Sequence, residues 1–354
     1  MNALYRYFMN CWYASHSPPW LLRLLAQAYG ALRNRAAPPS RRHQYPVTII
    51  VVGNITAGGA GKTPTVMALV QLLSQWGLRA GVISRGYGRR NKDLLEVSSQ
   101  CPVPDCGDEP VLIHRVCACP VVVADDRVAA LEHLLKHHEL DVVIADDGLQ
   151  HRALPRDLEI CLVDGQRGLG NGLLLPAGPL RDSPEVLARV DRVLYKGRQP
   201  KGLPLGEVVT VQLNQAVHID RGEAKPLSQW QGQTVQAVAG IGNPESFFYS
   251  LEQAGIKLQR HALADHQACS PVLAQRWAQR GPILMTAKDA VKWPAEGRED
   301  AWIVPMVFAL PDSFVNWLQA KLLRAQEQRQ SGNETEPAEP LDTADFPSSS
   351  RVGE

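Results

Sequence analysis

Residues 51 to 64 read VVGNITAGGAGKTP and contain side chains that are suited to binding phosphate groups. The usual phosphate-binding loop has the pattern G-x-x-x-x-G-K-[ST], and Gly61, Lys62 and Thr63 match its second half. The first glycine of the pattern falls on Thr56. In such a loop the lysine reaches the β- and γ-phosphates of a nucleotide and the threonine hydroxyl binds Mg²⁺. The alternative is a glycine-rich turn that binds nothing.

The elements on either side of this loop are those that a phosphate site requires. Residues 47 to 52 form an apolar, β-branched run of strand length, and residues 65 to 75 have one broad apolar face that predicts a helix. Glycines allow the backbone to curl so that its N–H groups point at a phosphate, and the helix start adds partial positive charge. We therefore expect a nucleotide to bind the loop formed by Thr56, Ala57, Gly58, Gly59, Ala60, Gly61, Lys62 and Thr63.

Two adjacent carboxylates follow a second buried strand. Asp146 and Asp147 come directly after residues 141 to 145, which read DVVIA and predict a strand. In a phosphate-loop protein, the carboxyl end of such a strand is where a carboxylate meets Mg²⁺, directly or through water. The alternative is a turn that caps a helix, but the nearby loop favours a metal role.

Three other polar positions have patterns that leave their role open. Asp108, in the segment GDEP, stands at a loop-to-helix junction, where an acid is more often a helix cap than a base. His266 follows Asp265, and a single histidine is usually structural. Arg181 ends a segment rich in glycine and proline, which either carries it to a transferring phosphoryl group or forms an ordinary loop.

Apolar strands alternate with helical patterns along most of the chain. Further strands are expected at residues 80–84, 121–124, 158–164 and 192–195, with a helix at 126–138. This order predicts an α/β fold of the P-loop type, with a mostly parallel sheet and helices on both faces. From about residue 208 the pattern changes, and a second, smaller α/β unit is expected, with strands at 235–239 and 283–286 and helices from 244 and near 314–326.

The chain is therefore expected to comprise four parts. They are a basic amphipathic segment (1–40), a P-loop kinase domain (41–205), a smaller α/β domain with its linker (206–330) and a disordered acidic tail (331–354).

Charge and cysteine content indicate which ligands the protein could bind and which compartment it could occupy. The 354 residues have a net charge of +1, but no acidic residue precedes Asp93, so the first quarter is basic and suited to anions. The seven cysteines show no disulfide framework, and we expect reduced cytosolic thiols. The chain has neither a secretory signal pattern nor an apolar run of about 18 residues.

The N-terminal segment has the pattern of a helix that lies on a membrane. Residues 19 to 35 read PWLLRLLAQAYGALRNR, with aromatic residues before them. Arginines lie mostly opposite an apolar stripe, as in interfacial helices. The alternative is a helix that packs on the core of the protein itself. The stripe consists of Leu21, Leu24, Leu25, Ala28 and Leu32.

Taken together, the motifs occur in the order that is seen in one family. The segments are VGNITAGGAGKTP, VISRGYGRR, GDEPVLI, DDGLQHRALPRDLEI, GNGLLLPAGPLR, AGIGNPESFF, LADH and TAKDAVK, between about residues 47 and 293. The chain resembles the tetraacyldisaccharide 4′-kinases, lipid A pathway enzymes of Gram-negative bacteria. In this family the phosphate-binding loop typically lacks the first glycine of the usual pattern, as it does here at Thr56. The sequence departs from the family at Ala287, where glutamate is usual.

The resemblance implies a role for each matched residue. ATP would bind residues 56 to 63, with Asp146 and Asp147 near Mg²⁺. Asp108 would act as the general base on the sugar 4′-hydroxyl, helped by His266, because a carboxylate alone is a weak base toward an alcohol. Arg181 would stabilise charge on the transferred phosphoryl group.

The resemblance also implies a substrate and a location. The acceptor would be a tetraacylated glucosamine disaccharide 1-phosphate, converted to its 1,4′-bisphosphate (lipid IVA). The enzyme would work at the cytoplasmic face of the inner membrane, held peripherally or by its N-terminus on anionic lipid, with no nucleic acid and no obligate protein partner. Two other readings stay open: a membrane-recruited P-loop ATPase that acts as a switch, and an ATP-dependent ligase.

Overall fold

The computed structural model describes residues 3–14, 16–35 and 45–332. The chain divides into two units, Met1–Val315 and Asn316–Glu354, and both β-sheets belong to the first. The helix α10 (Asp312–Gly332) includes the first two residues of the expected acidic tail. The rest of the tail lies outside the described residues, as do residues 36–40 of the expected N-terminal segment.

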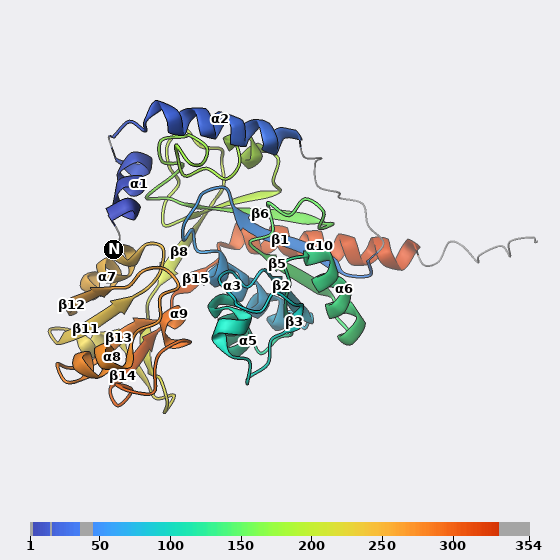
Figure 1. Ribbon diagram of the computed structural model, residues 1–354. Coiled ribbons are helices and arrows are strands. Elements are labelled where there is room, and N and C mark those ends of the chain that lie inside the picture. Colours follow the sequence, from blue (N-terminus) through green and yellow to red (C-terminus); the bar gives the residue numbers. More distant parts are fainter. Residues whose placement is uncertain (1–2, 15, 36–44, 333–354) are drawn as a thin grey trace, which may run out of the picture. The chain divides into compact units, whose positions relative to one another are not determined.

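The larger sheet has nine strands among the described residues, in the order β15-β8-β7-β6-β1-β5-β2-β4-β3 (Figure 1). All neighbouring strands are parallel except at the two edges, where β3 and β15 pair in the antiparallel sense. The bounds are β1 (Thr48–Asn54), β2 (Ala80–Ser84), β3 (Leu95–Glu96), β4 (Val121–Val123), β5 (Val142–Asp146), β6 (Leu158–Asp164), β7 (Arg192–Lys196), β8 (Glu207–Gln212) and β15 (Val307–Ala309). The predicted α/β fold with a mostly parallel sheet is confirmed.

Burial explains why the central strands are apolar along their whole length. Every residue of β1, β5 and β6 is buried, as expected for parallel strands covered on both faces. The helices α3 (Lys62–Gln75), α5 (Asp108–Cys117) and α6 (Arg127–His137) pack against this sheet. Because β1 lies between β5 and β6, the chain changes direction across the sheet there, which is where ligands bind in open α/β sheets.

The smaller sheet has six strands in the described chain, in the order β10-β9-β14-β13-β11-β12. The bounds are β9 (Gln215–His218), β10 (Ala224–Pro226), β11 (Thr234–Ala239), β12 (Lys257–Ala262), β13 (Ile283–Thr286) and β14 (Ala301–Val304). Its accompanying helices are α7 (Pro244–Gln253), α8 (Pro271–Ala278), α9 (Ala287–Ala290) and the 3-10 turn η2 (Leu227–Trp230). Buried side chains from β11, β14 and α7 form its core.

Two strands of the larger sheet come from residues that were expected in the smaller domain. β8 pairs with β7 in parallel, and β15 returns from the smaller sheet to pair with β8. The chain thus passes between the sheets more than once. The domain limits at residues 40, 205 and 330 stay a prediction.

The cysteine prediction is wrong for one pair. Cys101 and Cys106 form a disulfide, with Cα atoms 6.4 Å apart, around α4 (Val103–Cys106). The pairing closes a short loop around this helical turn, just before α5. The other five cysteines are free.

Two helices form the N-terminal part of the chain. α1 spans Ala3–Tyr13 and α2 spans Trp20–Arg35. α2 runs along the loops that follow β6, near the 3-10 turn η1 (Pro184–Ala188) (Figure 1). None of the helices in the described ranges has both the length and the apolar character that crossing a bilayer requires.

Candidate active site

The phosphate-loop segment adopts a turn that only glycine makes easily. β1 ends at Asn54 and α3 begins at Lys62, three residues earlier than the sequence pattern predicts. Gly58 and Gly61 have φ values of 107° and 98°, a region that residues with a side chain rarely adopt. A Cβ atom on Gly61 would also lie 2.7 Å from the ring of Phe308.

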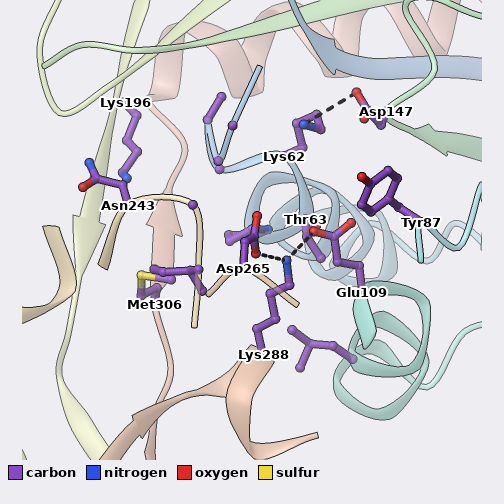
Figure 2. A pocket seen from close by; sticks show the side chains of 18 of the residues that line it. Lys62, Thr63, Tyr87, Glu109, Asp147, Lys196, Asn243, Asp265, Lys288 and Met306 are labelled. Atoms are coloured by element: carbon purple, nitrogen blue, oxygen red, sulfur yellow. Dashed lines mark hydrogen bonds and ion pairs between the residues drawn. The ribbon is translucent and has the colours of Figure 1, made fainter. Parts of the chain in front are cut away.

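Lys62 lies at the first turn of α3, at the mouth of this loop. Its Nζ donates a hydrogen bond to Oδ1 of Asn54 at 3.2 Å. The same atom lies 3.6 Å from Oδ1 of Asp147 (Figure 2). The ammonium group is therefore held at a helix N-terminus, where anions bind. Thr63 is the next residue and is buried.

A cavity of about 360 Å³ opens over the loop. Its walls come from the loop and α3, from α5 and from the segments that follow β11, β12 and β13 of the smaller sheet (Figure 2). Figure 2 shows Lys196, Asn243 and Met306 on one side of the cavity, and Glu109 and Tyr87 on the other. Every loop residue from 57 to 63 lines it. Thr56 is buried behind this surface and pairs with Leu180 through a backbone bridge.

The two adjacent carboxylates differ in their surroundings. Asp147 pairs with Nη1 of Arg181 at 2.9 Å, and its φ of 53° is unusual for a residue with a side chain. Burial opposes ionisation of Asp147, but Lys62 and Arg181 outweigh it and lower the pKa of the carboxyl. For Asp146, burial and then the charges of Glu109 and Asp147 raise the pKa.

Asp146 has the features of a cation ligand. The carboxyl is 1 % exposed, and among the described residues its Oδ1 has no hydrogen-bond partner. Buried carboxylates are normally paired or bind a metal. The described chain contains no cluster of three or more His, Cys, Asp or Glu arranged to hold a metal by itself. Mg²⁺ typically needs only one or two carboxylates beside substrate phosphates and water, so the residues present fit this ion.

A second group of charges lies across the cavity from the loop. Asp108, the first residue of α5, accepts from Nδ1 of His266, which lies 3.0 and 3.1 Å from its two oxygens. Nζ of Lys292 is 3.2 Å and Nζ of Lys288 4.0 Å from the same carboxylate. Burial opposes ionisation of Asp108, but His266, Lys288 and Lys292 outweigh it and hold the pKa well below its usual range. The structure thus joins Asp108 and His266.

The backbone at His266 supports a specific role. Its φ is 63°. Among the described residues, the other non-glycine residues with a positive φ are Asp147 and Ala118. Such conformations cost energy and gather at functional sites. The His266 side chain lines the cavity, whereas Asp108 lies behind it at 5 % exposure.

Lys288 is a residue that the sequence analysis did not assign to the site. Its Nζ lies 3.0 Å from Oε1 of Glu109 and 3.0 Å from Oδ1 of Asp265 (Figure 2). Burial disfavours the charged form, but Glu109, Asp108 and Asp265 outweigh it and raise the pKa of this lysine. The sequence feature that could have pointed to Lys288 as a site residue is its place in the TAKDAVK segment. The neighbouring Ala287 lines the cavity.

Tyr87 is a further side chain at the site whose role the sequence left unassigned. Its ring centroid lies 5.2 Å from that of His266, and its side chain is 65 % exposed on the cavity wall. The segment SRGYGRR contains it, and the turn there is fixed by the buried Arg89, which donates to the carbonyl oxygens of Arg85 and Lys92.

Comparison with known proteins relates this arrangement to one family. The model of the tetraacyldisaccharide-1-P 4'-kinase family matches residues 18–323. A tetraacyldisaccharide 4'-kinase of Stenotrophomonas maltophilia is 45% identical over 316 residues, covering 86% of this chain and 93% of that protein. One from Actinobacillus pleuropneumoniae serotype 5b is 42% identical over 308 residues, covering 84% and 93%.

A solved structure agrees with the sequence relatives. The crystal structure of LpxK from Aquifex aeolicus in complex with ATP has a TM-score of 0.67 and 27% identity, covering 86% of this chain and 96% of that chain. The glycine loop, the paired acids and the Asp108–His266 contact lie within the matched residues. The chain belongs to the tetraacyldisaccharide-1-P 4'-kinase family.

Proposed function

We propose that the protein transfers the γ-phosphate of ATP to the 4′-hydroxyl of a tetraacylated glucosamine disaccharide 1-phosphate, giving the 1,4′-bisphosphate of lipid A synthesis. The observation that carries the proposal is one cavity that holds a phosphate-binding loop on one side and an Asp–His pair on the other. A switch ATPase or a ligase needs no such pair, and the relatives are named as kinases.

The loop side of the cavity supplies the groups that bind and stabilise phosphate. Backbone N–H groups of residues 57 to 63 would surround the phosphates, and Lys62 would contact the β- and γ-phosphates. Arg181, which is held on Asp147, would stabilise the charge that develops on the transferred group. Thr63, Asp146 and Asp147 would hold Mg²⁺, which neutralises phosphate charge when it is bound.

The opposite side supplies the base. The sugar 4′-oxygen forms a bond to the γ-phosphorus while the bond to the β-phosphate oxygen breaks, and ADP leaves. The hydroxyl proton passes to the Asp108–His266 pair. Asp108 stays ionised because its pKa is lowered, and it orients the His266 ring from behind the cavity wall.

One incubation tests the proposed reaction. Purified protein, γ-labelled ATP and Mg²⁺ are mixed with the tetraacyl disaccharide 1-phosphate dispersed in detergent. We expect label in the lipid product, and none when the 4′-hydroxyl is replaced by hydrogen in the acceptor. ATP consumption without labelled lipid would favour the ATPase or the ligase reading instead.

We further propose that α2 rests on the inner membrane at its cytoplasmic face. The expected apolar stripe points away from the rest of the protein: Leu21, Leu24, Leu25 and Leu32 are 51%, 53%, 49% and 67% exposed. Trp20 precedes them at 76% exposure. Exposed apolar patches of this kind are typical of membrane contact, and they suit a substrate whose acyl chains remain in the bilayer.

Replacing Leu24 and Leu25 together by glutamate should weaken binding to anionic vesicles by roughly tenfold or more, because each leucine is half-exposed and its entry into the bilayer contributes about 1 kcal/mol. Flotation of the protein with vesicles measures this. Thermal stability should hardly change, since both side chains are exposed. Val272→Glu serves as the control, because Val272 is also exposed and apolar but lies on α8. Equal flotation of the stripe variant and the wild type would remove the membrane proposal.

A further inference from the structure

The inner face of α2 contacts the loop that carries Arg181. Tyr29 Oη donates a hydrogen bond to the carbonyl oxygen of Arg181 at 2.9 Å. The next residue of the loop, Asp182, accepts from Arg33, with Nε at 3.1 Å and Nη2 also in contact. Gly30, between them, is buried and faces the side chain of Leu174.

Asp182 is connected in turn to the phosphate-binding lysine. The carboxylate is 7% exposed, and its second oxygen accepts from Nε2 of Gln150 at 3.0 Å. The same Gln150 nitrogen donates to the carbonyl oxygen of Asn54 at 2.9 Å. Asn54 uses its side-chain oxygen to accept from Lys62 at 3.2 Å. An unbroken series of polar contacts therefore runs from α2 to Lys62.

Arg181 is held at both ends by this arrangement. Its backbone N–H donates to the carbonyl oxygen of Ile55 at 2.7 Å, and its carbonyl accepts from Tyr29. Its guanidinium then reaches Asp147 at 2.9 Å. The position of the guanidinium thus depends on a backbone that α2 helps to fix.

We infer that Tyr29 and Arg33 are positioning residues for phosphoryl transfer, acting through the Arg181–Asp182 segment on Arg181 and Lys62. The inference rests on the proposed kinase function. α2 is then part of the catalytic unit as well as a membrane contact, because one face carries the exposed leucines and the other holds the segment. Displacement of a charged group by about 1 Å is enough to lower a rate strongly.

Steady-state kinetics on detergent-dispersed substrate test this inference without a bilayer. We expect Arg33→Met to lower kcat about tenfold, since a charge-assisted, two-point contact is lost, with little change in KM for the lipid. Arg33→Lys should recover part of the loss, because lysine keeps the charge but not the paired geometry. Arg23→Met removes the same charge from an exposed position of α2 and should retain the wild-type kcat.

A second, milder variant keeps the inference testable if Arg33→Met does not fold. Tyr29→Phe removes a single hydroxyl and should lower kcat about threefold, as loss of one hydrogen bond does. The Tyr29→Phe effect should disappear in an Arg181→Ala background, because Tyr29 acts on the Arg181 carbonyl and has nothing left to position. The Arg33→Met loss should become smaller there without vanishing, because Arg33 also acts on Lys62 through Asp182, Gln150 and Asn54. A purely structural role for α2 would instead multiply the losses in both backgrounds.

The outcomes separate this inference from the function on which it rests. Wild-type protein that transfers no label overturns the kinase proposal itself. Active wild-type protein with an unchanged kcat in Arg33→Met and Tyr29→Phe overturns only the positioning role, as does a full loss that persists in the Arg181→Ala background.

Discussion

Replacing Lys62 by alanine is expected to lower phosphoryl transfer by about a hundredfold or more while the fold is retained. The ammonium group is preorganised at the start of α3, where the phosphates would bind, and loss of such a charge costs on the order of 3 kcal/mol or more of transition-state stabilisation. The rate of label transfer from ATP to the lipid measures the effect.

Two comparisons make this result interpretable. Thermal stability should change little, because Asp147 keeps its contact with Arg181 when Lys62 is removed. Lys257→Ala, at an exposed position at the start of β12, removes the same charge far from the loop in sequence and should be fully active. Near-normal transfer by the Lys62→Ala protein would remove the phosphate-loop assignment.

The second large effect is expected at the Asp108–His266 pair. Asp108→Ala and His266→Ala should each lower kcat by about 10²-fold or more, as loss of a general base does. The double variant should be no slower than the slower single variant, because the two side chains form one hydrogen-bonded unit. The turnover rates of the three variants and the wild type form the double-mutant cycle that measures this coupling.

The pH profile adds an independent measurement. Because the pKa of Asp108 is held below its usual range, its protonation should not produce the acid limb of the rate profile at any pH above about 4. His137→Ala, an exposed histidine on α6, is the control and should leave both turnover and profile unchanged. Fully multiplicative losses at Asp108 and His266 would mean that the two residues act separately.

The sequence predicted well those elements that are specified by residues adjacent in the chain. Strands at 80–84, 158–164 and 283–286 have the predicted bounds, because short runs of β-branched and apolar residues specify buried strands by themselves. The glycine loop was predicted for the same reason, since its turn, strand and helix are adjacent in the chain. The start of α3 was missed because Gly61 caps the helix before its apolar face begins.

The helix α2 shows what a hydrophobic pattern in the sequence can predict and what it cannot. The apolar stripe of α2 was visible in the sequence, and two uses of it were considered: contact with lipid and packing on the protein. The structure shows the stripe exposed, while Tyr29 and Arg33 on another side of the helix bind the Arg181 loop. A single hydrophobic period describes one face, so it could not reveal that a second face makes specific polar contacts.

What the sequence determined by itself was the α/β class, the phosphate loop and, through its motifs, the family. What only the tertiary structure decided was which side chains meet: Asp108 contacts His266 across 158 positions of the chain, and Lys288 contacts Glu109 across 179. It also decided that β15 returns to the first sheet and that Cys101 pairs with Cys106. The physical reason is that secondary structure follows from neighbours in sequence, whereas charge pairing and sheet order depend on how separate elements pack together.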